Sequence, residues 1–302
     1  HTVTLGFEEY RGTPADEVPQ ARHLARQVGA THASVFTTAA DFEADAERLL
    51  DAMDQPSIDG VNTWFVSKAA RGAGLKVALS GLGGDELFAS YPSFSEIPRI
   101  VSMMRRLSLL RRHGANIRGL LAPLVRRITS PKYASLPEYG GTYGGAYLLR
   151  RALHLPWEQL GDLSRREIEQ GWNELQTLQR LDATVGHTAV APGSVSALEM
   201  SWYMRNQLLR DADWASMAHS LEVRTPLVDW PLIRTVAPLL AAHPNLSKSE
   251  LFQRAAPNLM TELLRRPKTG FSIPVQQWLA GGNRYADFLH GRGLRGWAAY
   301  VL

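Results

Sequence analysis

The chain has 302 residues, of which 45% are hydrophobic and 21% are charged, an ordinary globular composition that excludes a disordered or low-complexity protein. It contains no cysteine, which excludes disulfides, thiolate metal sites and a cysteine nucleophile within this chain and fits a cytoplasmic location. The net charge of +4 would suit a polyanionic ligand, and the length allows one large domain or two smaller ones.

The N-terminal part alternates β-rich runs with helical spacing of apolar residues. In chain order these segments are 2–7, 19–28, 32–37, 39–53, 61–71 and 76–79. Strands separated by helices predict parallel pairing with right-handed crossovers, so the predicted fold class is α/β. In open parallel sheets, ligands bind at the carboxyl ends of the strands, which points to Ser80 and the residues after it.

Strand signals fade from Ile97 onward, and leucine- and arginine-rich helical stretches take over. Residues 131–145, rich in glycine and tyrosine, predict a loop or a domain hinge. Residues 162–180 have helical spacing, and residues 194–221 predict a long helical region with a break near Asp211.

Basic residues concentrate between Arg105 and Arg127, where leucine and isoleucine are interleaved with them. This pattern favours solvated faces of amphipathic helices. A nucleic-acid surface is the alternative, but no recognised binding motif or aromatic platform supports it, so we expect no nucleic-acid partner. No apolar stretch reaches the roughly 18 residues of a membrane-spanning helix, and the first residues lack the features of a signal peptide, so we expect no membrane partner.

The most informative segment is 79–88, with the sequence Leu-Ser-Gly-Leu-Gly-Gly-Asp-Glu-Leu-Phe. Its glycines follow a strand directly and let the backbone turn sharply and approach a ligand closely. The turn would run into a helix whose free N–H groups form an anion site, with Ser80 adding a hydroxyl donor. Asp85 could hold a magnesium ion that bridges phosphate oxygens. The alternative is that Asp85 and Glu86 only complement the helix dipole.

This segment is not a P-loop, since no Gly-Lys-Ser/Thr follows, and it is not a dinucleotide fingerprint. It resembles the second signature of the asparagine synthetase family, a serine-glycine loop that ends in Asp-Glu. Residues 208–229 and 266–271 resemble, in the same order, the long helical signature and the C-terminal lysine loop of that family. The resemblance covers essentially the whole chain, although residues 98–192 are only weakly diagnostic.

The resemblance implies a synthetase domain of the N-type ATP pyrophosphatase fold, a parallel-sheet core of the adenine nucleotide alpha hydrolase type followed by a mainly helical region. Such a domain adenylates a carboxylate, releases pyrophosphate and lets an amine attack the acyl-adenylate. The implied cofactors are ATP and Mg²⁺. The implied cofactor-binding positions are Leu5, Gly6, Ser80, Gly81, Gly83, Gly84 and Asp85.

Individual roles follow from the same resemblance. Leu5 and Gly6 match the backbone position beside the adenine, and Asp85 matches a residue that shares magnesium with an upstream aspartate. Lys268 matches the lysine that neutralises the charge developing during acyl transfer, which makes it the implied catalytic residue. The alternative for Lys268 is an ordinary loop lysine, but the proline and glycine that pin its loop favour the catalytic role.

A charged cluster within the helical signature has two interpretations: a buried ion-pair lattice that shapes the pocket, or purely structural contacts, which we favour for most members. The cluster comprises Asp211, Asp213, Glu222, Arg224 and Asp229. His219 lies on the same stretch, but without other ligands at suitable spacing it is not expected to bind a metal.

The sequence departs from the family in three respects. The first phosphate motif, a Ser-Gly-Gly-x-Asp-Ser loop with its strand, should lie upstream of His1. We therefore expect residues 1–95 to form a partial nucleotide-binding core and residues 96–302 the mainly helical part of the same domain. An N-terminal glutaminase domain is expected in a longer parent protein. Leu82 stands where asparagine synthetases carry glutamate, and leucine cannot accept a proton or position ammonia, which puts aspartate as the substrate in question.

The sequence thus predicts a carbon–nitrogen ligase with glutamine as amido donor. The expected substrate is a small-molecule carboxylate, with aspartate as the first candidate. Its partner would be the glutaminase domain of the parent, and a homodimer is one assembly it could form. This fragment alone is expected to be inactive, because the missing loop holds phosphates and metal. The alternatives are an amidotransferase or β-lactam-synthetase-like enzyme on another carboxylate, and a degenerate scaffold, which Ser80, Asp85 and Lys268 argue against.

Overall fold

The computed structural model describes residues 1–107, 109, 112–158, 163–186, 191–243, 246, 248–255, 273–281 and 294–301. Contacts divide the chain into two compact units, and each unit has its own hydrophobic core. The first unit comprises His1–Gly84 and Asn206–Leu302, and the second comprises Asp85–Arg205. None of the described helices is long and apolar enough to cross a membrane.

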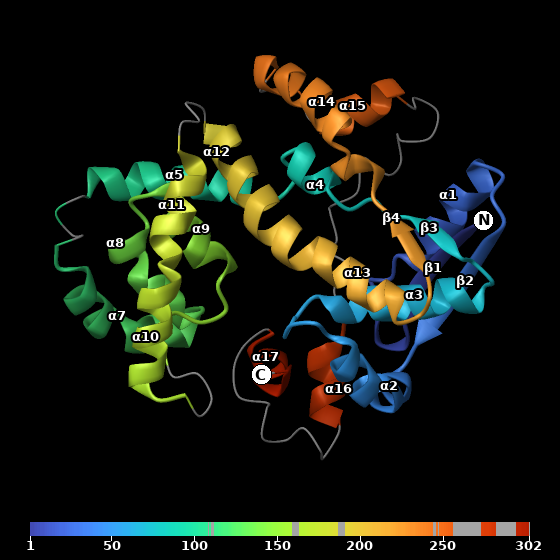
Figure 1. The fold of residues 1–302 in the computed structure, drawn as a ribbon, viewed down its shortest axis with the longest axis horizontal. Coiled ribbons are helices and arrows are strands. Elements are labelled where there is room, and N and C mark those ends of the chain that lie inside the picture. The colour runs from blue at the N-terminus through green and yellow to red at the C-terminus, as the bar shows by residue number, and fades with distance from the viewer. Residues whose placement is uncertain are drawn as a thin grey trace. The chain divides into compact units, whose positions relative to one another are not determined.

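The first unit contains two pairs of parallel strands (Figure 1). Strand β1 (Thr2–Phe7) pairs with β2 (His32–Thr37) in register from end to end, and β3 (Val77–Leu79) pairs with β4 (Glu222–Arg224). The parallel pairing confirms the predicted α/β class. Strand β4 was not predicted, because a strand of three residues is too short to show an alternating pattern and gains its hydrogen bonds from β3.

The first three helices lie close to where their sequence signals placed them. They are α1 (Val18–Gln27), α2 (Ala39–Ala52) and α3 (Gly60–Gly72). Helix α2 begins with a capping box: Thr38 Oγ1 accepts from the amide of Asp41 at 3.2 Å, and Asp41 Oδ2 accepts from the amide of Thr38 at 2.9 Å. These local signals explain why the helices could be predicted.

Aromatic residues dominate the core of the first unit. Trp64, Trp278 and Trp297 are at most 4% exposed, and Phe42 stacks on Trp278 with ring centroids 5.1 Å apart. This core brings α3 next to α13 (Leu209–Met217), and α2 next to α16 (Val275–Gly281). The other described helices of the unit are the 3₁₀ helices Glu8–Tyr10 and Pro226–Val228, α14 (Trp230–Ala242), α15 (Lys248–Ala255) and α17 (Arg295–Val301).

The described residues of the second unit are mainly helical, and Figure 1 shows α5, α9, α11 and α12 side by side around their own core. In chain order the elements are α4 (Gly84–Leu87), which spans the junction, α5 (Ser93–Arg106), α7 (Gly114–Ile128), the 3₁₀ helix Pro131–Ser135, α8 (Leu136–Tyr139), α9 (Tyr143–Arg151), α10 (Arg165–Leu175), α11 (Thr177–Val185) and α12 (Ala191–Leu198). A π-helical segment, Glu199–Leu208, connects α12 to α13.

Residues 131–145 are not the loop that their composition predicted. Pro131 and Pro137 both lie in the first turn of a helical segment, where the missing amide hydrogen has no intrahelical partner to lose. Thr142 caps α9, because its Oγ1 accepts from the amide of Gly145 at 3.0 Å. Proline and glycine therefore begin helices here instead of interrupting them.

Two other helical predictions need correction in detail. The stretch 162–180 is divided at Gln176, whose φ of 47° lies in the left-handed region and separates α10 from α11. The region 194–221 has no break near Asp211, which lies inside α13. Aspartate disturbs helices by bonding to its own backbone, but the Asp211 carboxylate bonds to Ser57 and Trp214 instead. The irregularity lies earlier, in the π-helical segment.

Candidate functional site

The glycine-rich loop, residues 80–84, directly follows β3. The amide of Ser80 donates to Arg224 O at 2.8 Å, which extends the β3–β4 pairing by one bond. The amide of Leu82 donates to Ser80 Oγ at 3.3 Å, and the amide of Gly84 donates to Gly81 O at 3.2 Å. The loop is thus a closed turn at the carboxyl ends of two parallel strands, the position at which ligands bind in such sheets.

The loop glycines have different surroundings. Gly83 has a φ of +87°, and a Cβ added there would lie 2.6 Å from Val228 Cγ2. A Cβ on Gly84 would lie 3.0 Å from Leu227 Cδ1, whereas one on Gly81 would meet nothing within 4 Å. One side of the loop is therefore packed against the 3₁₀ helix Pro226–Val228, and the exposed Gly81 leaves the backbone open to a ligand.

Two amides of this loop have no hydrogen-bond acceptor in the part of the chain that the structure describes. Among the described residues, the N–H groups of Gly81 and Gly83 donate to no hydrogen-bond acceptor. Loop amides that lack a protein acceptor are what backbone anion sites offer, and the exposed Gly81 is the open position of this turn. The predicted ATP-contacting residues Ser80, Gly81, Gly83 and Gly84 thus lie together on one turn whose chemistry suits an anion.

Asp85 follows this loop and is the first residue of the second unit. Its helix, α4, has only four residues, so most of the anion chemistry belongs to the loop and little to a helix dipole. The amide of Ser90 donates to Asp85 O at 2.9 Å. Glu86 is 1% exposed and accepts from the Tyr91 hydroxyl at 2.9 Å, and burial raises its pKa. The idea that both acids only complement a helix end therefore does not fit Glu86.

The half-buried carboxylate of Asp85 fits a magnesium ion as one ligand among several. Mg²⁺ prefers oxygen donors and is commonly held by one or two carboxylates together with substrate phosphates. Within the described residues, no group of three or more His, Cys, Asp or Glu side chains could hold a metal by itself. The remaining ligands would have to come from phosphate, water or other protein segments.

Leu5 and Gly6 lie near the end of β1, in the same unit as the loop. The Leu5 side chain is 4% exposed and belongs to the core, so only its backbone could face a ligand. A Cβ on Gly6 would lie 2.7 Å from Val18 Cγ2 and 2.8 Å from Phe36 Cε1. Gly6 therefore allows α1 and β2 to approach β1 closely. Lys268, the predicted catalytic residue, lies outside the described residues, as does the rest of its loop.

The charged cluster of the helical signature does not form a common ion-pair lattice in the described part of the chain. Asp211 is 1% exposed and accepts from Ser57 and Trp214, and burial raises its pKa to about 6. Glu222 and Arg224 pair with each other at the surface. Asp213 is exposed, and Asp229 caps α14 by accepting from the amide of Leu232 at 3.2 Å.

Sequence reasoning missed a buried acid in the second unit. Glu199 is 0% exposed and accepts two hydrogen bonds from Arg151, at 3.0 and 2.7 Å, and one from Ser93 at 2.5 Å. The available signal was a single acidic residue inside the otherwise uncharged stretch 191–204. Such an acid is rarely buried unless it is paired, so it marks a specific contact.

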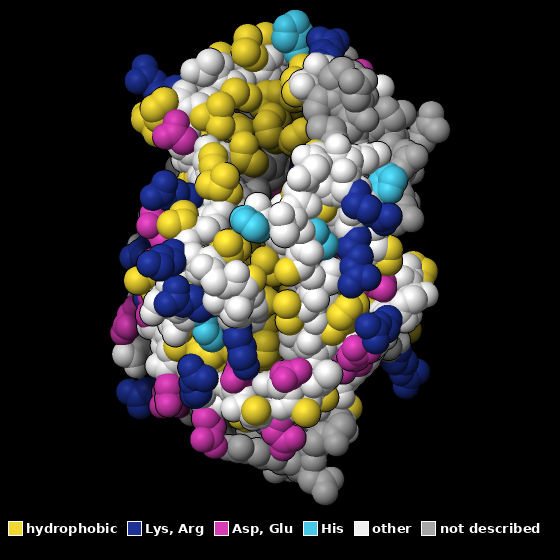
Figure 2. All heavy atoms as spheres, turned by 90° about the vertical axis from the view of Figure 1, so that its right-hand side faces the viewer, with side chains coloured by type: hydrophobic (Ala, Val, Ile, Leu, Met, Phe, Trp, Pro, Cys, Tyr) yellow, Lys and Arg dark blue, Asp and Glu magenta, His cyan; other side chains and the backbone are white. Residues whose placement is uncertain are grey.

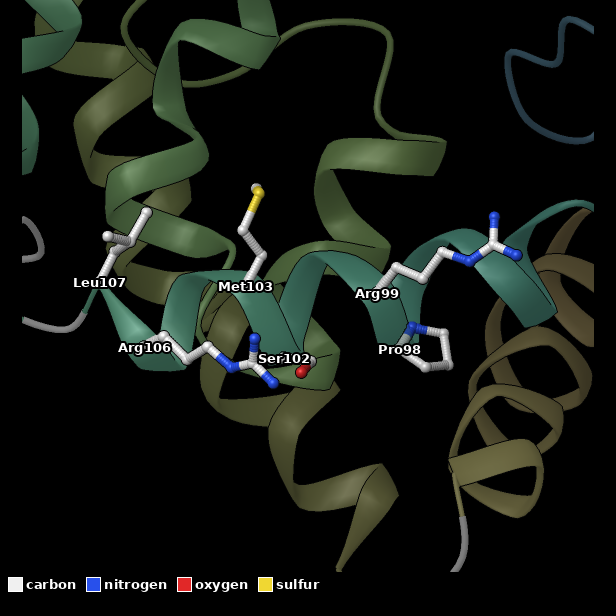
Figure 3. Close-up of a pocket in the computed structure, with 6 residues that line it drawn as sticks. All are labelled: Pro98, Arg99, Ser102, Met103, Arg106 and Leu107. Carbon is white, nitrogen blue, oxygen red and sulfur yellow. The ribbon is translucent and has the colours of Figure 1, made fainter.

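A hollow of about 590 Å³ lies elsewhere in the second unit, along α5 (Figure 3). Its lining residues come from this one helix and from Leu107 directly after it, and they include Arg99 and Arg106 beside Met103. It contains none of the predicted site residues. On the face drawn in Figure 2, basic and acidic side chains are interspersed.

Comparisons with known proteins agree over nearly the whole chain. The family model described as asparagine synthase matches residues 1–292. A Mycobacterium tuberculosis protein provisionally named asparagine synthetase (glutamine-hydrolysing) is 29% identical over 296 residues, which cover 93% of this chain and 42% of that protein. Asparagine synthetase (glutamine-hydrolysing) 1 of Bacillus subtilis is 24% identical and is covered to 43%. The chain therefore spans less than half the length of these relatives. No solved structure matches it.

Proposed function

The chain belongs to the asparagine synthase family, and from this premise we propose that it is the synthetase part of an ATP-dependent amide-forming ligase. In the proposed reaction, an oxygen of the substrate carboxylate attacks the α-phosphorus of ATP and pyrophosphate leaves. Ammonia or an amine then attacks the acyl carbon, and AMP leaves as the amide forms. Carboxylates are poor acyl donors, and adenylation supplies the leaving group.

The observation that carries this proposal is the loop 80–84. It follows a parallel strand, it is open at Gly81, and the amides of Gly81 and Gly83 have no partner among the described residues. Ser80 Oγ lies on the same turn, where it already accepts from the Leu82 amide and can donate its hydrogen to a phosphate oxygen. These donors would hold the negative charge of the nucleotide phosphates.

Asp85 would be one ligand of the Mg²⁺ that accompanies the nucleotide. When bound, this ion neutralises negative charge on the phosphates and on the departing pyrophosphate. Asp85 contributes an oxygen ligand at the end of the phosphate-facing turn, and its backbone carbonyl is fixed by the amide of Ser90. We propose Lys268 as the cation that stabilises the charge developing at the acyl-transfer step.

The edge of β3 that faces away from β4 is the proposed place for the strand that carries the first phosphate motif. In the described part of the chain β3 pairs with β4 alone, and the β3 side chains Val77 and Leu79 are 41% and 76% exposed. An exposed apolar edge strand is a site for further pairing. We propose that a strand from the rest of the protein, carrying the Ser-Gly-Gly-x-Asp-Ser loop, pairs here and completes the phosphate site.

The substrate and the nitrogen source are proposed at a coarser level. The substrate is a small-molecule carboxylate, and the half-buried Leu82 disfavours aspartate because it replaces a proton-accepting residue with an inert one. The relatives' names include glutamine hydrolysis, so glutamine is the proposed donor, through a glutaminase domain of the whole protein. A homodimer and a cytoplasmic location remain part of this proposal.

The test is pyrophosphate release by the full-length parent protein with ATP and Mg²⁺, measured with aspartate and a panel of other carboxylates, with and without glutamine. Release that depends on one carboxylate and is lost in Asp85→Asn and Lys268→Met would support the ligase and identify the substrate. If the folded parent bound ATP but released no pyrophosphate with any carboxylate, the degenerate scaffold would be the better interpretation.

A further inference from the structure

A buried polar cluster in the second unit surrounds the Glu199 carboxylate. Arg151 donates to Glu199 Oε2 from Nε at 3.0 Å and from Nη2 at 2.7 Å, and Ser93 donates its hydroxyl hydrogen to Oε1 at 2.5 Å. These residues come from the π-helical segment, the end of α9 and the start of α5. Since both carboxylate oxygens are bonded, the direction of the guanidinium is fixed.

The Arg151 guanidinium also contacts two tyrosine rings. Its Cζ lies 3.7 Å from the ring centroid of Tyr203 and 4.9 Å from that of Tyr91, and the two rings meet edge to face at 6.2 Å. A guanidinium over an aromatic face is attracted by the ring electrons. Tyr91 is therefore held by a cation that Glu199 itself holds in place.

Tyr91 connects this cluster to α4. Its hydroxyl donates to Glu86 Oε1 at 2.9 Å, and Glu86 is the buried neighbour of Asp85 on α4. A helix of four residues is not stable through its own hydrogen bonds, so α4 depends on contacts from outside it. The Tyr91–Glu86 bond is such a contact, one residue away from the carboxylate that would bind magnesium.

Stability alone does not explain the Arg151–Glu199 pair, in which the Glu199 carboxylate is fully buried and the Arg151 side chain is 25% exposed. Burying a carboxylate costs free energy, and replacing such pairs by hydrophobic residues is often neutral or stabilising. What a hydrogen-bonded ion pair adds is one defined geometry. Here the series of contacts that starts at Glu199 ends beside Asp85.

We propose that Arg151 and Glu199 are positioning residues of the nucleotide site, which act through Tyr91 and Glu86 to hold Asp85 in the orientation that binds the magnesium–nucleotide complex. The metal-binding part of this proposal rests on the proposed function, whereas the mechanical coupling from Glu199 to α4 does not. Loss of the coupling would loosen α4 in the free protein and weaken metal binding, without unfolding the second unit.

The test uses three variants of the full-length parent protein. Tyr91→Phe removes the hydroxyl that bonds Glu86 and keeps the ring against Arg151. Tyr147→Phe is the matched control, because it removes the hydroxyl that lies 3.4 Å from Glu199 Oε2 and leaves the Tyr91–Glu86 bond in place. Arg151→Met combined with Glu199→Met removes the ion pair as a whole. If the double variant does not fold, the two tyrosine variants still decide the question.

The first measurement needs no ligand: hydrogen exchange of the backbone amides in residues 85–91, followed by mass spectrometry. We expect faster exchange in Tyr91→Phe and in the double variant, and the exchange of the unmodified protein in Tyr147→Phe. Equal exchange in Tyr91→Phe and the unmodified protein would overturn the mechanical coupling. Equally accelerated exchange in both tyrosine variants would also overturn it, because the effect would then be general softening.

The second measurement is Mn²⁺ binding, followed by electron paramagnetic resonance with an α,β-methylene analogue of ATP. Supporting contacts around a metal ligand typically change affinity by about 10- to 100-fold, so we expect about 10-fold weaker binding in Tyr91→Phe and no change in Tyr147→Phe. Unchanged binding in Tyr91→Phe would overturn the positioning role alone. An unmodified protein that binds no Mn²⁺–analogue complex would overturn the proposed function and the metal role together.

Discussion

Ser57 donates its hydroxyl hydrogen to the buried carboxylate of Asp211 at 2.6 Å, and this bond joins the segment between α2 and α3 to the first turn of α13. Trp214, three residues further along α13, donates its indole hydrogen to the other oxygen of Asp211 at 3.0 Å. Burial raises the pKa of Asp211 to about 6, and the neighbouring negative charges of Asp59 and Asp54 act in the same direction. The two hydrogen bonds only partly offset these effects.

The raised pKa predicts how Asp211 affects stability. The folded state binds the proton more tightly than the unfolded state, so this residue stabilises the fold below about pH 4, and the contribution is lost as the pH rises through about 6. In Asp211→Asn, which can still bond to Ser57 and Trp214, this loss should be absent, a difference on the order of 3 kcal/mol. Urea unfolding of both proteins at pH 4.5 and 7.5 checks this. Parallel pH dependence in the two proteins would contradict it.

A second prediction concerns the close approach of α3 and α13. A Cβ added to Gly60 would clash with the ring of Trp214, which is buried and cannot move freely. We expect Gly60→Ala to lower the free energy of unfolding by about 1–3 kcal/mol. Gly72, at the other end of α3, has nothing within 4 Å of an added Cβ. Gly72→Ala should therefore be neutral or slightly stabilising, and equal destabilisation in both variants would refute the packing argument.

The loop glycines allow the folding role to be separated from the ligand role. Gly83→Ala would place a Cβ against Val228 in a left-handed backbone conformation, and we expect a loss of about 1–3 kcal/mol in unfolding free energy. Gly81→Ala meets no neighbour and should change stability by less than about 0.5 kcal/mol. Calorimetric titration of the full-length protein with the methylene analogue of ATP should nevertheless show weaker binding for Gly81→Ala. Unchanged binding would mean that no ligand approaches this side of the loop.

The elements that could be predicted from the sequence are those with local signals. The strand at 32–37 and the helix that begins after Thr38 agree with the structure because their signals lie in or next to the segments themselves: the capping box at the start of α2, and Pro56 shortly after its end. Strand β4 is different, because its three residues are extended only by pairing with β3, which is distant in sequence. The prolines at 131 and 137 show that a residue type alone does not distinguish the start of a helix from its interruption.

The candidate site also has one part that local sequence signals predict and one part that depends on contacts between residues distant in sequence. The loop 80–84 could be predicted because its glycines and Ser80 act within a few residues of each other. The contacts proposed to hold Asp85 in place could not be predicted from the sequence, since Arg151 and Glu199 are 48 positions apart and Ser93 and Glu199 are 106 positions apart. No local pattern specifies such contacts: α5 packs against α9, and hydrogen bonds from Ser93 and Arg151 join both helices to Glu199 of the π-helical segment.

Asp45 is the opposite case to Asp211 and gives the last prediction. It is 4% exposed, and burial alone would raise its pKa, but hydrogen bonds from Lys68 Nζ at 2.6 Å and from Trp64 Nε1 at 3.0 Å outweigh burial and hold the pKa below its usual value. A lowered pKa means that the unfolded state binds the proton more tightly. Asp45 therefore stabilises the fold above about pH 4, and its contribution is lost as the pH falls through the folded-state pKa.

Lys68→Met should remove most of this stabilisation while keeping an apolar stem of similar length on α3. Leaving a buried carboxylate without its cation is costly, but Lys68 is 44% exposed, so we expect a loss of about 1–2 kcal/mol at pH 7. The difference from the unmodified protein should shrink below about pH 4, where the unfolded carboxyl group is protonated. Lys76→Met, in an exposed residue just before β3, serves as the control for loss of one positive charge. If both variants lose the same stability at pH 7, the effect comes from net charge and the Asp45–Lys68 pair contributes nothing specific.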